Sequence, residues 1–275
     1  MLSLRHIPPA PLSELVGCFW YWEGAPVTHS YERLLPNGEA AIIFNLRDRP
    51  IRIYDARNIA RFQSFGYAVL SGARSDCFVI DTDQQERVMG IQFRPGGAFP
   101  FLRMPAPEVE GLPVPLEDVW GGRSAPIREQ LLAARNVEAM FAVLEQNLTA
   151  QLVRPPELHP AVSYAVRRFC ACGSGGESVA EITERVGLSS RRFIELFHRQ
   201  VGLTPKTFSR VRRFQRVLKA VHRKREIDWA RVAAENGYYD QAHFIHDFHG
   251  FSGFTPTAYA TLDTAHLNHV PLRTD

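Results

Sequence analysis

Hydrophobic positions change their spacing along this chain, from strand-like in the first hundred residues to helix-like beyond them. Short apolar runs separated by Asn-Gly, Asp-Arg-Pro, Ser-Gly and Asp-Thr-Asp turns predict β-strands. These expected strands are 40–46, 51–55, 66–70, 77–80 and 88–93. Apolar residues spaced by three and four then predict helices over 127–134 and, after Asn136 as N-cap, over 137–152.

A chain of 275 residues is long enough for about two domains. The boundary is expected at Arg154-Pro155-Pro156, because two prolines there follow a helical pattern. We therefore expect a β-rich domain over 1–153, a helical domain over 157–262 and a tail over 263–275. The combined fold class is α+β with two domains.

The helical part contains a repeat of about fifty residues. Two sets of matching positions define it, the first offset by 50 and the second by 51. The first set pairs Ala180, Ile182 and Gly187 with Ala230, Val232 and Gly237. The second pairs Phe193, Phe197, Gly202, Thr204 and Pro205 with Phe244, Phe248, Gly253, Thr255 and Pro256. An offset that changes only at a turn is typical of two copies of one structural unit.

Each copy reads as a helix, a glycine turn, a second helix and a Thr-Pro start to the next one. Ser189 and Asp240 are the expected N-caps of the second helices, and proline suits the first position of a helix. This is helix-turn-helix organisation, in which the second helix enters the DNA major groove. Apolar spacing over 205–221 predicts one long helix that joins the two units.

Projection of the first recognition helix at 100° per residue places Arg191, Glu195 and His198 outward. Arg191 suits a bidentate contact to guanine, and Glu195 could accept from a cytosine amino group. Arg192 and Arg199 lie on the flank, where contacts to phosphate fix position without reading sequence. Ser189 and Ser190 complete the DNA-binding residues expected here. The alternative interpretation of this helix face is a solvated basic surface.

In the second recognition helix, Gln241, His243 and His246 are the expected DNA-binding residues. Gln241 suits adenine, whereas the histidines carry charge only when protonated. The segment 240–251 contains no lysine or arginine and holds Asp240 and Asp247. We therefore expect this unit to bind weakly, or more strongly at mildly acid pH.

The charge distribution supports an anionic partner. Residues 1–154 carry 15 basic and 17 acidic side chains, whereas residues 155–275 carry 17 and 12. Between Arg185 and Arg231 there are 14 basic residues and three acidic ones. A helical segment with that excess is an electrostatic footprint for a polyanion such as DNA.

The stretch from Ser178 to Tyr259 closely resembles the DNA-binding domain of the AraC/XylS family of transcription regulators. The matching segments are VAEITERVGLSSRRFIELFHRQVGLTPKTFSRVRRFQ and WARVAAENGYYDQAHFIHDFHGFSGFTPTAYA. The resemblance implies an all-α domain with two helix-turn-helix units joined by a long helix. It also implies double-stranded promoter DNA and RNA polymerase as partners, usually in activation.

The segments LPNGEAAIIFNL and FRPGGAFPFL are similar to the N-terminal region of one large subgroup of this family. That similarity implies a cupin-like barrel that binds a small-molecule effector or forms a homodimer. Aromatic and histidine side chains at strand spacing are the candidates for lining an effector pocket, although such residues are more often core. They are Trp20, Trp22, His29, Tyr54 and Phe93. The stripe after Ile127 fits either a dimer seam or packing onto the barrel.

Two other classes compete with a regulator: a metal-dependent cupin-type enzyme, and a DNA-binding architectural protein without an effector. The N-terminal half has two widely separated histidines, His6 and His29, and no motif for metal, nucleophile or phosphate. We therefore expect no catalytic residue, no metal and no cofactor. The apolar run 12–22 lacks a targeting signal and nothing is long enough to span a membrane, which favours a cytoplasmic protein. Cys170 and Cys172 are expected to be idle thiols rather than sensors.

Overall fold

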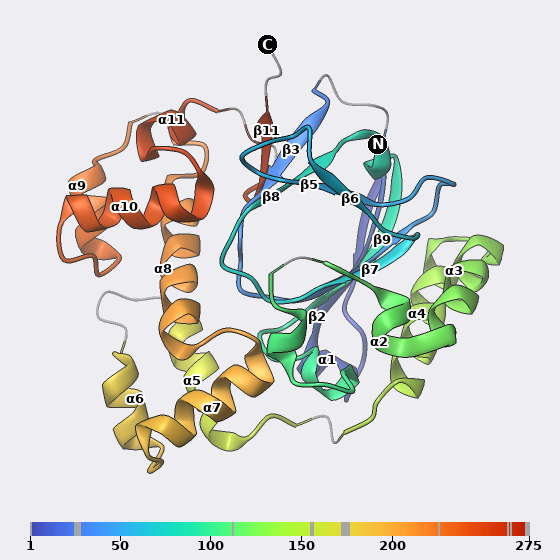
Figure 1. Ribbon diagram of the computed structural model, residues 1–275, viewed down its shortest axis with the longest axis horizontal. Coiled ribbons are helices and arrows are strands. Elements are labelled where there is room, and N and C mark those ends of the chain that lie inside the picture. The colour runs from blue at the N-terminus through green and yellow to red at the C-terminus, as the bar shows by residue number, and fades with distance from the viewer. Residues whose placement is uncertain are drawn as a thin grey trace.

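The computed structural model describes residues 2–24, 29–111, 113–154, 157–171, 177–224, 226–262, 264 and 266–272. Two antiparallel sheets with covering helices form the N-terminal part, and a group of helices packs beside them (Figure 1). This arrangement confirms the predicted fold class, a β-rich N-terminal domain followed by a helical one. The expected boundary at Pro155-Pro156 lies outside the described residues.

The strands form a six-stranded and a five-stranded sheet. In spatial order the six-stranded sheet contains β1 (Leu2–His6), β2 (Val16–Glu23), β9 (Arg87–Phe93), β4 (Ala41–Asn45), β7 (Ala68–Ser71) and β10 (Val114–Pro115). The five-stranded sheet contains β11 (His269–Leu272), β3 (Tyr31–Leu34), β8 (Phe78–Asp81), β5 (Arg52–Tyr54) and β6 (Phe62–Ser64). Val69 of the first sheet and Ile53 and Phe78 of the second share one apolar cluster, so the sheets pack face to face.

Helices cover the opposite face of the six-stranded sheet. They are α1 (Leu12–Leu15), α2 (Leu116–Trp120), α3 (Ser124–Ala133) and α4 (Val137–Ala150), with the short 3-10 helices η2 (Phe99–Phe101), η3 (Ala106–Val109) and η4 (Gly121–Arg123). A further 3-10 helix, η1 (Asp83–Gln85), connects β8 to β9. Ile127, Leu131 and Leu144 are buried in one core with Phe19 and Tyr21 of β2. The stripe after Ile127 therefore packs onto the sheet. Its predicted cap is present, since Asn136 accepts a hydrogen bond from the backbone of Ala139.

The five predicted strands correspond to β4, β5, β7, β8 and β9, with ends that differ by at most two residues. Sequence reasoning missed β1, β2, β3, β6, β10 and β11. The run containing β2 is nearly continuous in apolar residues because Phe19 and Tyr21 face the helices while Trp20 and Trp22 alternate to the other side. That pattern hides the period of two that identifies a half-buried strand.

Seven helices make up the described C-terminal part. They are α5 (Pro160–Cys170), α6 (Val179–Arg185), α7 (Ser190–Val201), α8 (Pro205–Val221), α9 (Trp229–Glu235), α10 (Gln241–Ser252) and α11 (Pro256–Ala260). The long helix predicted over 205–221 is α8, which runs between the two helix groups (Figure 1). Phenylalanines dominate both cores: Phe193, Phe197 and Phe208 in the first and Phe214, Phe244 and Phe248 in the second.

The N-terminal part contributes to both helical cores. Ala73 belongs to the first, and Leu35 belongs to the second together with Val270 of β11. The buried Gln215 of α8 donates to the Pro36 carbonyl oxygen at 2.7 Å. The segment 263–275, expected as a tail, contains β11, which pairs antiparallel with β3. Residues 269–272 thus extend the five-stranded sheet of the N-terminal part.

Candidate nucleic-acid interface

Both helix-turn-helix units are built from the same local devices. Gly187 and Gly237 occupy the turns with φ of 67° and 74°, a left-handed conformation that glycine adopts without strain. Ser189 caps α7 by accepting from the Arg192 backbone N–H at 3.3 Å, and Asp240 caps α10 by accepting from His243 at 2.7 Å. These caps satisfy backbone donors and fix where each recognition helix begins. The predicted N-caps are confirmed.

The outward face of α7 is polar and basic, as the helical projection predicts. The Arg191 side chain is 90% exposed, and its Nε donates to Glu195 Oε1 at 2.9 Å. Ser190, Arg192 and Arg199 are exposed as well. Because exposed ion pairs are weak, the Arg191 guanidinium can exchange Glu195 for another acceptor at little cost.

The structure places a carboxylate of the N-terminal part against α7. His198 Nε2 lies 3.4 Å from Glu110 Oε2, directly after η3. The backbone of the same segment approaches Gly202 at the end of α7, where an added Cβ would come within 3.5 Å of the Ala106 oxygen. His198 is therefore half-buried, and its end of the helix faces an acidic group of the same chain.

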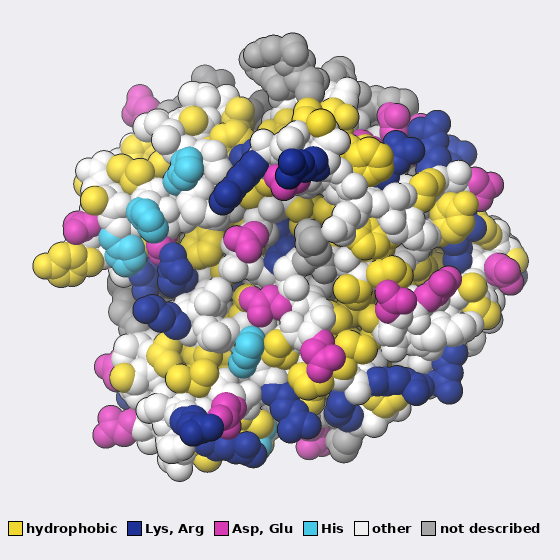
Figure 2. Space-filling model, viewed as in Figure 1, with side chains coloured by type: hydrophobic (Ala, Val, Ile, Leu, Met, Phe, Trp, Pro, Cys, Tyr) yellow, Lys and Arg dark blue, Asp and Glu magenta, His cyan; other side chains and the backbone are white. Residues whose placement is uncertain are grey.

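The outward face of α10 carries amide and imidazole groups. Gln241 is exposed, and the His246 side chain is 85% exposed. His243 turns toward the helix flank, where its Nε2 lies 3.6 Å from Asp247 Oδ2 and its ring meets Tyr238 edge-on. Histidine side chains gather over α10, whereas lysine and arginine side chains gather lower on the same side, around α6 and α7 (Figure 2).

The acidic residues of the second unit do not face outward as a group. Asp247 is 2% exposed and accepts from Arg210 Nη2 of α8 at 2.6 Å. This hydrogen bond raises the pKa of Arg210 against the effect of its partial burial. Asp240 is occupied as the N-cap. The offset of 51 aligns Asp247 with Leu196, which occupies an inward position. This alignment could have predicted from the sequence that Asp247 points inward and has a structural role.

Three exposed apolar side chains near the recognition helices were not predicted. Ile194 is 41% exposed and Ile245 is 40% exposed, at equivalent positions of α7 and α10. Tyr239, directly before the cap Asp240, is 93% exposed. Large apolar groups usually leave solvent, so their placement on the outward side of both units calls for an explanation.

Each of the five residues expected to bind an effector has contacts within this chain. Phe93 lies in the core against Phe101, and buried Tyr54 donates to Asp81 Oδ2 at 2.9 Å. Trp20 covers Gly90, and Trp22 meets His266 edge-on. His29 pairs with Glu32 at 2.8 Å.

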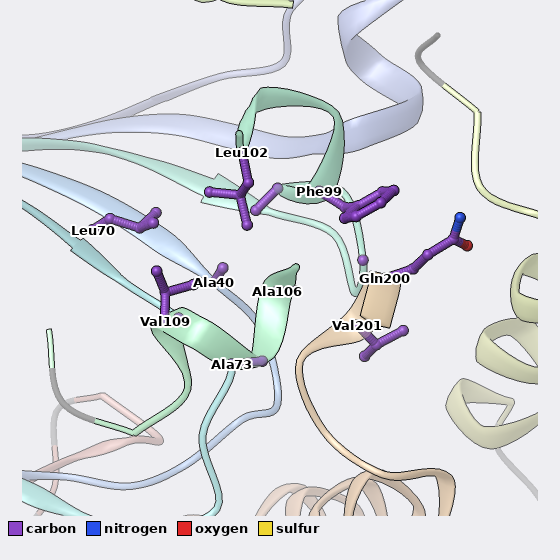
Figure 3. Close-up of a pocket in the computed structure, with 12 residues that line it drawn as sticks. Ala40, Leu70, Ala73, Phe99, Leu102, Ala106, Val109, Gln200 and Val201 are labelled. Carbon is purple, nitrogen blue, oxygen red and sulfur yellow. The ribbon is translucent and has the colours of Figure 1, made fainter. Parts of the chain in front are cut away.

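A cavity of about 10 Å³ lies where the N-terminal part meets the end of α7 (Figure 3). It is lined by residues such as Ala106, Val109 and Val201, and by none of those five. Its volume suffices for about one water molecule.

Neither metal ligands nor membrane segments stand out in the part of the chain that the structure describes. No group of three or more His, Cys, Asp or Glu side chains there could hold a metal ion. No helix there has the length and hydrophobicity needed to cross a membrane. Cys170 is half-buried, and burial raises the pKa of its thiol, while Cys172 lies outside the described residues.

Two family profiles match separate parts of the chain. The family profile described as a helix-turn-helix domain matches residues 182–261, and one described as a domain of unknown function (DUF6597) matches residues 4–115. No curated protein gives a significant match.

Solved structures that match include AraC-type regulators. An AraC-type transcriptional regulator from Chromobacterium violaceum is 21% identical, covering 36% of this chain and 87% of its own, with a TM-score of 0.33. The C-terminal domain of AraT from Geobacillus stearothermophilus is 17% identical, covering 40% and 96%, with a TM-score of 0.35.

An apo variant of ToxT from Vibrio cholerae spans both parts of the chain. It is 10% identical and covers 88% of this chain and 96% of its own, with a TM-score of 0.45. Together with the repeat, the caps and the two recognition helices, the profile match over residues 182–261 identifies the C-terminal part of this chain as an AraC-type, DNA-binding helix-turn-helix domain.

Proposed function

We propose that this protein is a transcription regulator that reads two successive major-groove segments of promoter DNA with α7 and α10. The observation that carries the proposal is the pair of equivalent, capped helices that both expose polar faces from one helical domain. In a helix-turn-helix the second helix enters the groove with its N-terminal residues against the bases. Arg191 and Gln241 stand at these N-terminal ends.

The long helix between the two units supports reading along one face of the duplex. The 17 residues of α8 correspond to a rise of about 25 Å, so one rigid helix holds the units apart, as readers of successive major grooves require. Cores on either side of α8 hold the units through Phe208 and Phe214. A single chain can then occupy two half-sites without a second copy.

We further propose that the two units bind phosphate and bases unequally. Arg192 and Arg199 give α7 fixed positive charge, whereas α10 depends on histidines that are cationic only when protonated. Binding should therefore tighten between pH 8 and pH 6, and His246→Gln should reduce that change. Equal affinity of the wild-type protein at the two pH values would exclude this role for the histidines.

We also propose that a small-molecule effector bound to the N-terminal part controls DNA binding. The N-terminal part supplies Leu35 to the core of the second unit and Ala73 to that of the first. A ligand that shifts one of these residues would alter the recognition helix of the unit into which it packs. Activation is the expected outcome, because regulators of this type usually recruit RNA polymerase.

The direct test is binding of the purified full-length protein to genomic DNA fragments at near-physiological salt, followed by sequencing of the retained fragments. We expect enrichment of one motif with two elements about one helical turn apart. Retention without any sequence preference would instead favour an architectural protein. Stoichiometric iron in the purified protein would favour a cupin-type enzyme.

A further inference from the structure

Two isoleucines stand at the same position of the two recognition helices. Ile194 of α7 and Ile245 of α10 are separated by 51 residues, the offset that also relates Phe193 to Phe244. Phe193 and Phe244 are fully buried, whereas the two isoleucines are 41% and 40% exposed. In each helix, a buried phenylalanine is thus followed directly by an exposed isoleucine.

The isoleucines border the surface that carries the polar candidates. Ile194 lies three residues after Arg191 and four before His198, so the three share one side of α7. At 100° per residue, Arg192 and Arg199 lie on the other flank of Arg191, away from Ile194. Ile245 lies four residues after Gln241, on the corresponding side of α10.

We infer that Ile194 and Ile245 are specificity-determining residues that contact the 5-methyl groups of thymines in the two half-sites. The inference rests on the proposed function and deepens it. Among the base edges in the major groove, thymine alone displays an apolar group, its methyl. An aliphatic side chain at the surface of a recognition helix is complementary to that group and to none of the charged phosphates.

The consequence for base preference is clearest in the second unit. Its helix lacks lysine and arginine, so the usual bidentate contact to guanine is absent from α10. Gln241 suits adenine, and Ile245 suits the methyl group of a thymine. Both residues therefore favour A·T pairs, and we expect the half-site under α10 to be defined by A·T pairs. The half-site under α7 combines a guanine for Arg191 with a thymine for Ile194.

The test uses the DNA motif recovered with the wild-type protein. Each thymine is replaced singly by uracil, which keeps the base pair and removes only the methyl group. We expect one position in each half-site to weaken binding about three- to tenfold, comparable to the loss of one buried methyl contact. Ile245→Ala should bind with a similar loss and no longer respond to uracil in the second half-site. Ile194→Ala should show the same behaviour in the first half-site.

Leu132→Ala is the matched control, because Leu132 of α3 is 40% exposed and lies outside the helical domain. It should leave affinity and the uracil response unchanged. One result would overturn the inference: sequence-specific binding that is unchanged when any thymine is replaced by uracil, together with wild-type affinity of both isoleucine variants. The isoleucines would then face a protein partner. Absence of any sequence-specific binding would be a different failure, since it removes the proposed function itself.

Discussion

The two helix-turn-helix units share their interiors and differ in their exteriors. Phenylalanines, positive-φ glycines and Thr-Pro helix starts occur at matching positions in both. Outside, the first unit exposes Arg191, Arg192 and Arg199, while the second exposes Gln241 and histidines. The common interior preserves a helix geometry that can enter a groove. The different exteriors give two copies of one fold different chemistry for the DNA contacts proposed above.

The units also attach differently to the N-terminal part. The first meets η3 and Glu110 near the outward face of α7. The second is joined through β11, whose His269 binds Glu32 of β3 at 2.8 Å. If α7 binds DNA as proposed, contacts on the first unit affect access to it, whereas contacts on the second unit affect its stability.

The largest expected effect concerns the ion pair between buried Asp247 and partly exposed Arg210 in the second unit. Arg210→Met should lower the free energy of unfolding by about 3–5 kcal/mol, because Asp247 would remain buried without its charge partner. Urea denaturation measures the change. The double variant Arg210→Met with Asp247→Leu should recover most of the stability, since it places the residue type of Leu196 at the equivalent position. A single variant as stable as the wild type would contradict this assignment.

Acid should weaken the attachment of β11. Burial alone would raise the pKa of Glu32, but hydrogen bonds and charge from His269, with hydrogen bonds from His29 and Gln85, outweigh it and hold the pKa at about 2. Because the folded-state pKa is depressed, its stabilisation is present above about pH 4.5 and is lost as pH falls toward 2. That stabilisation is about 3 kcal/mol.

Urea denaturation at pH 5 and pH 3 tests this prediction against the variant Glu32→Gln. The wild-type protein should lose more stability over that interval than the variant, which has no carboxylate at this position to protonate. Identical losses in the two proteins would show that Glu32 is not linked to folding in this way.

The first unit should lose base discrimination when Arg191 is replaced. Arg191→Ala should weaken binding to the recovered site by about 1–3 kcal/mol and relax the preference at one base pair. Arg199→Ala should weaken binding to all sequences alike and lower the salt slope by about one. Competition binding at several salt concentrations separates the two. Sequence-blind losses in both variants would end this division between base and phosphate contacts.

The smallest expected effect concerns Glu110. Glu110→Gln removes a carboxylate 3.4 Å from His198 and should tighten DNA binding severalfold, by less than about 1 kcal/mol. Glu108→Gln is the control, because it makes the same change in net charge at an exposed neighbouring residue. Equal effects of the two variants would indicate a general charge effect instead of local masking of α7.

Much of the helical domain could be predicted because its signals are local. Ser189 and Asp240 cap helices through contacts three residues away, and the turn glycines need only their own backbone conformation. The N-terminal strands were harder to predict. The short β3 and β6 have no clear alternation, and the apolar run of β2 hides its period. The five proposed effector residues were chosen by residue type and strand spacing, which do not indicate which neighbours each side chain contacts in the folded chain.

The sequence by itself determined the repeat, the boundaries of the recognition helices and the outward placement of Arg191 and Glu195. All of these follow from spacing along one helix, where neighbours in space are neighbours in sequence. Only the tertiary structure decided that Asp247 is buried against Arg210, that Glu110 meets His198 and that β11 joins β3. Those contacts link residues that are 37, 88 and more than 230 positions apart. Their formation depends on how whole helices and sheets pack, and hydrophobic periodicity does not encode that arrangement.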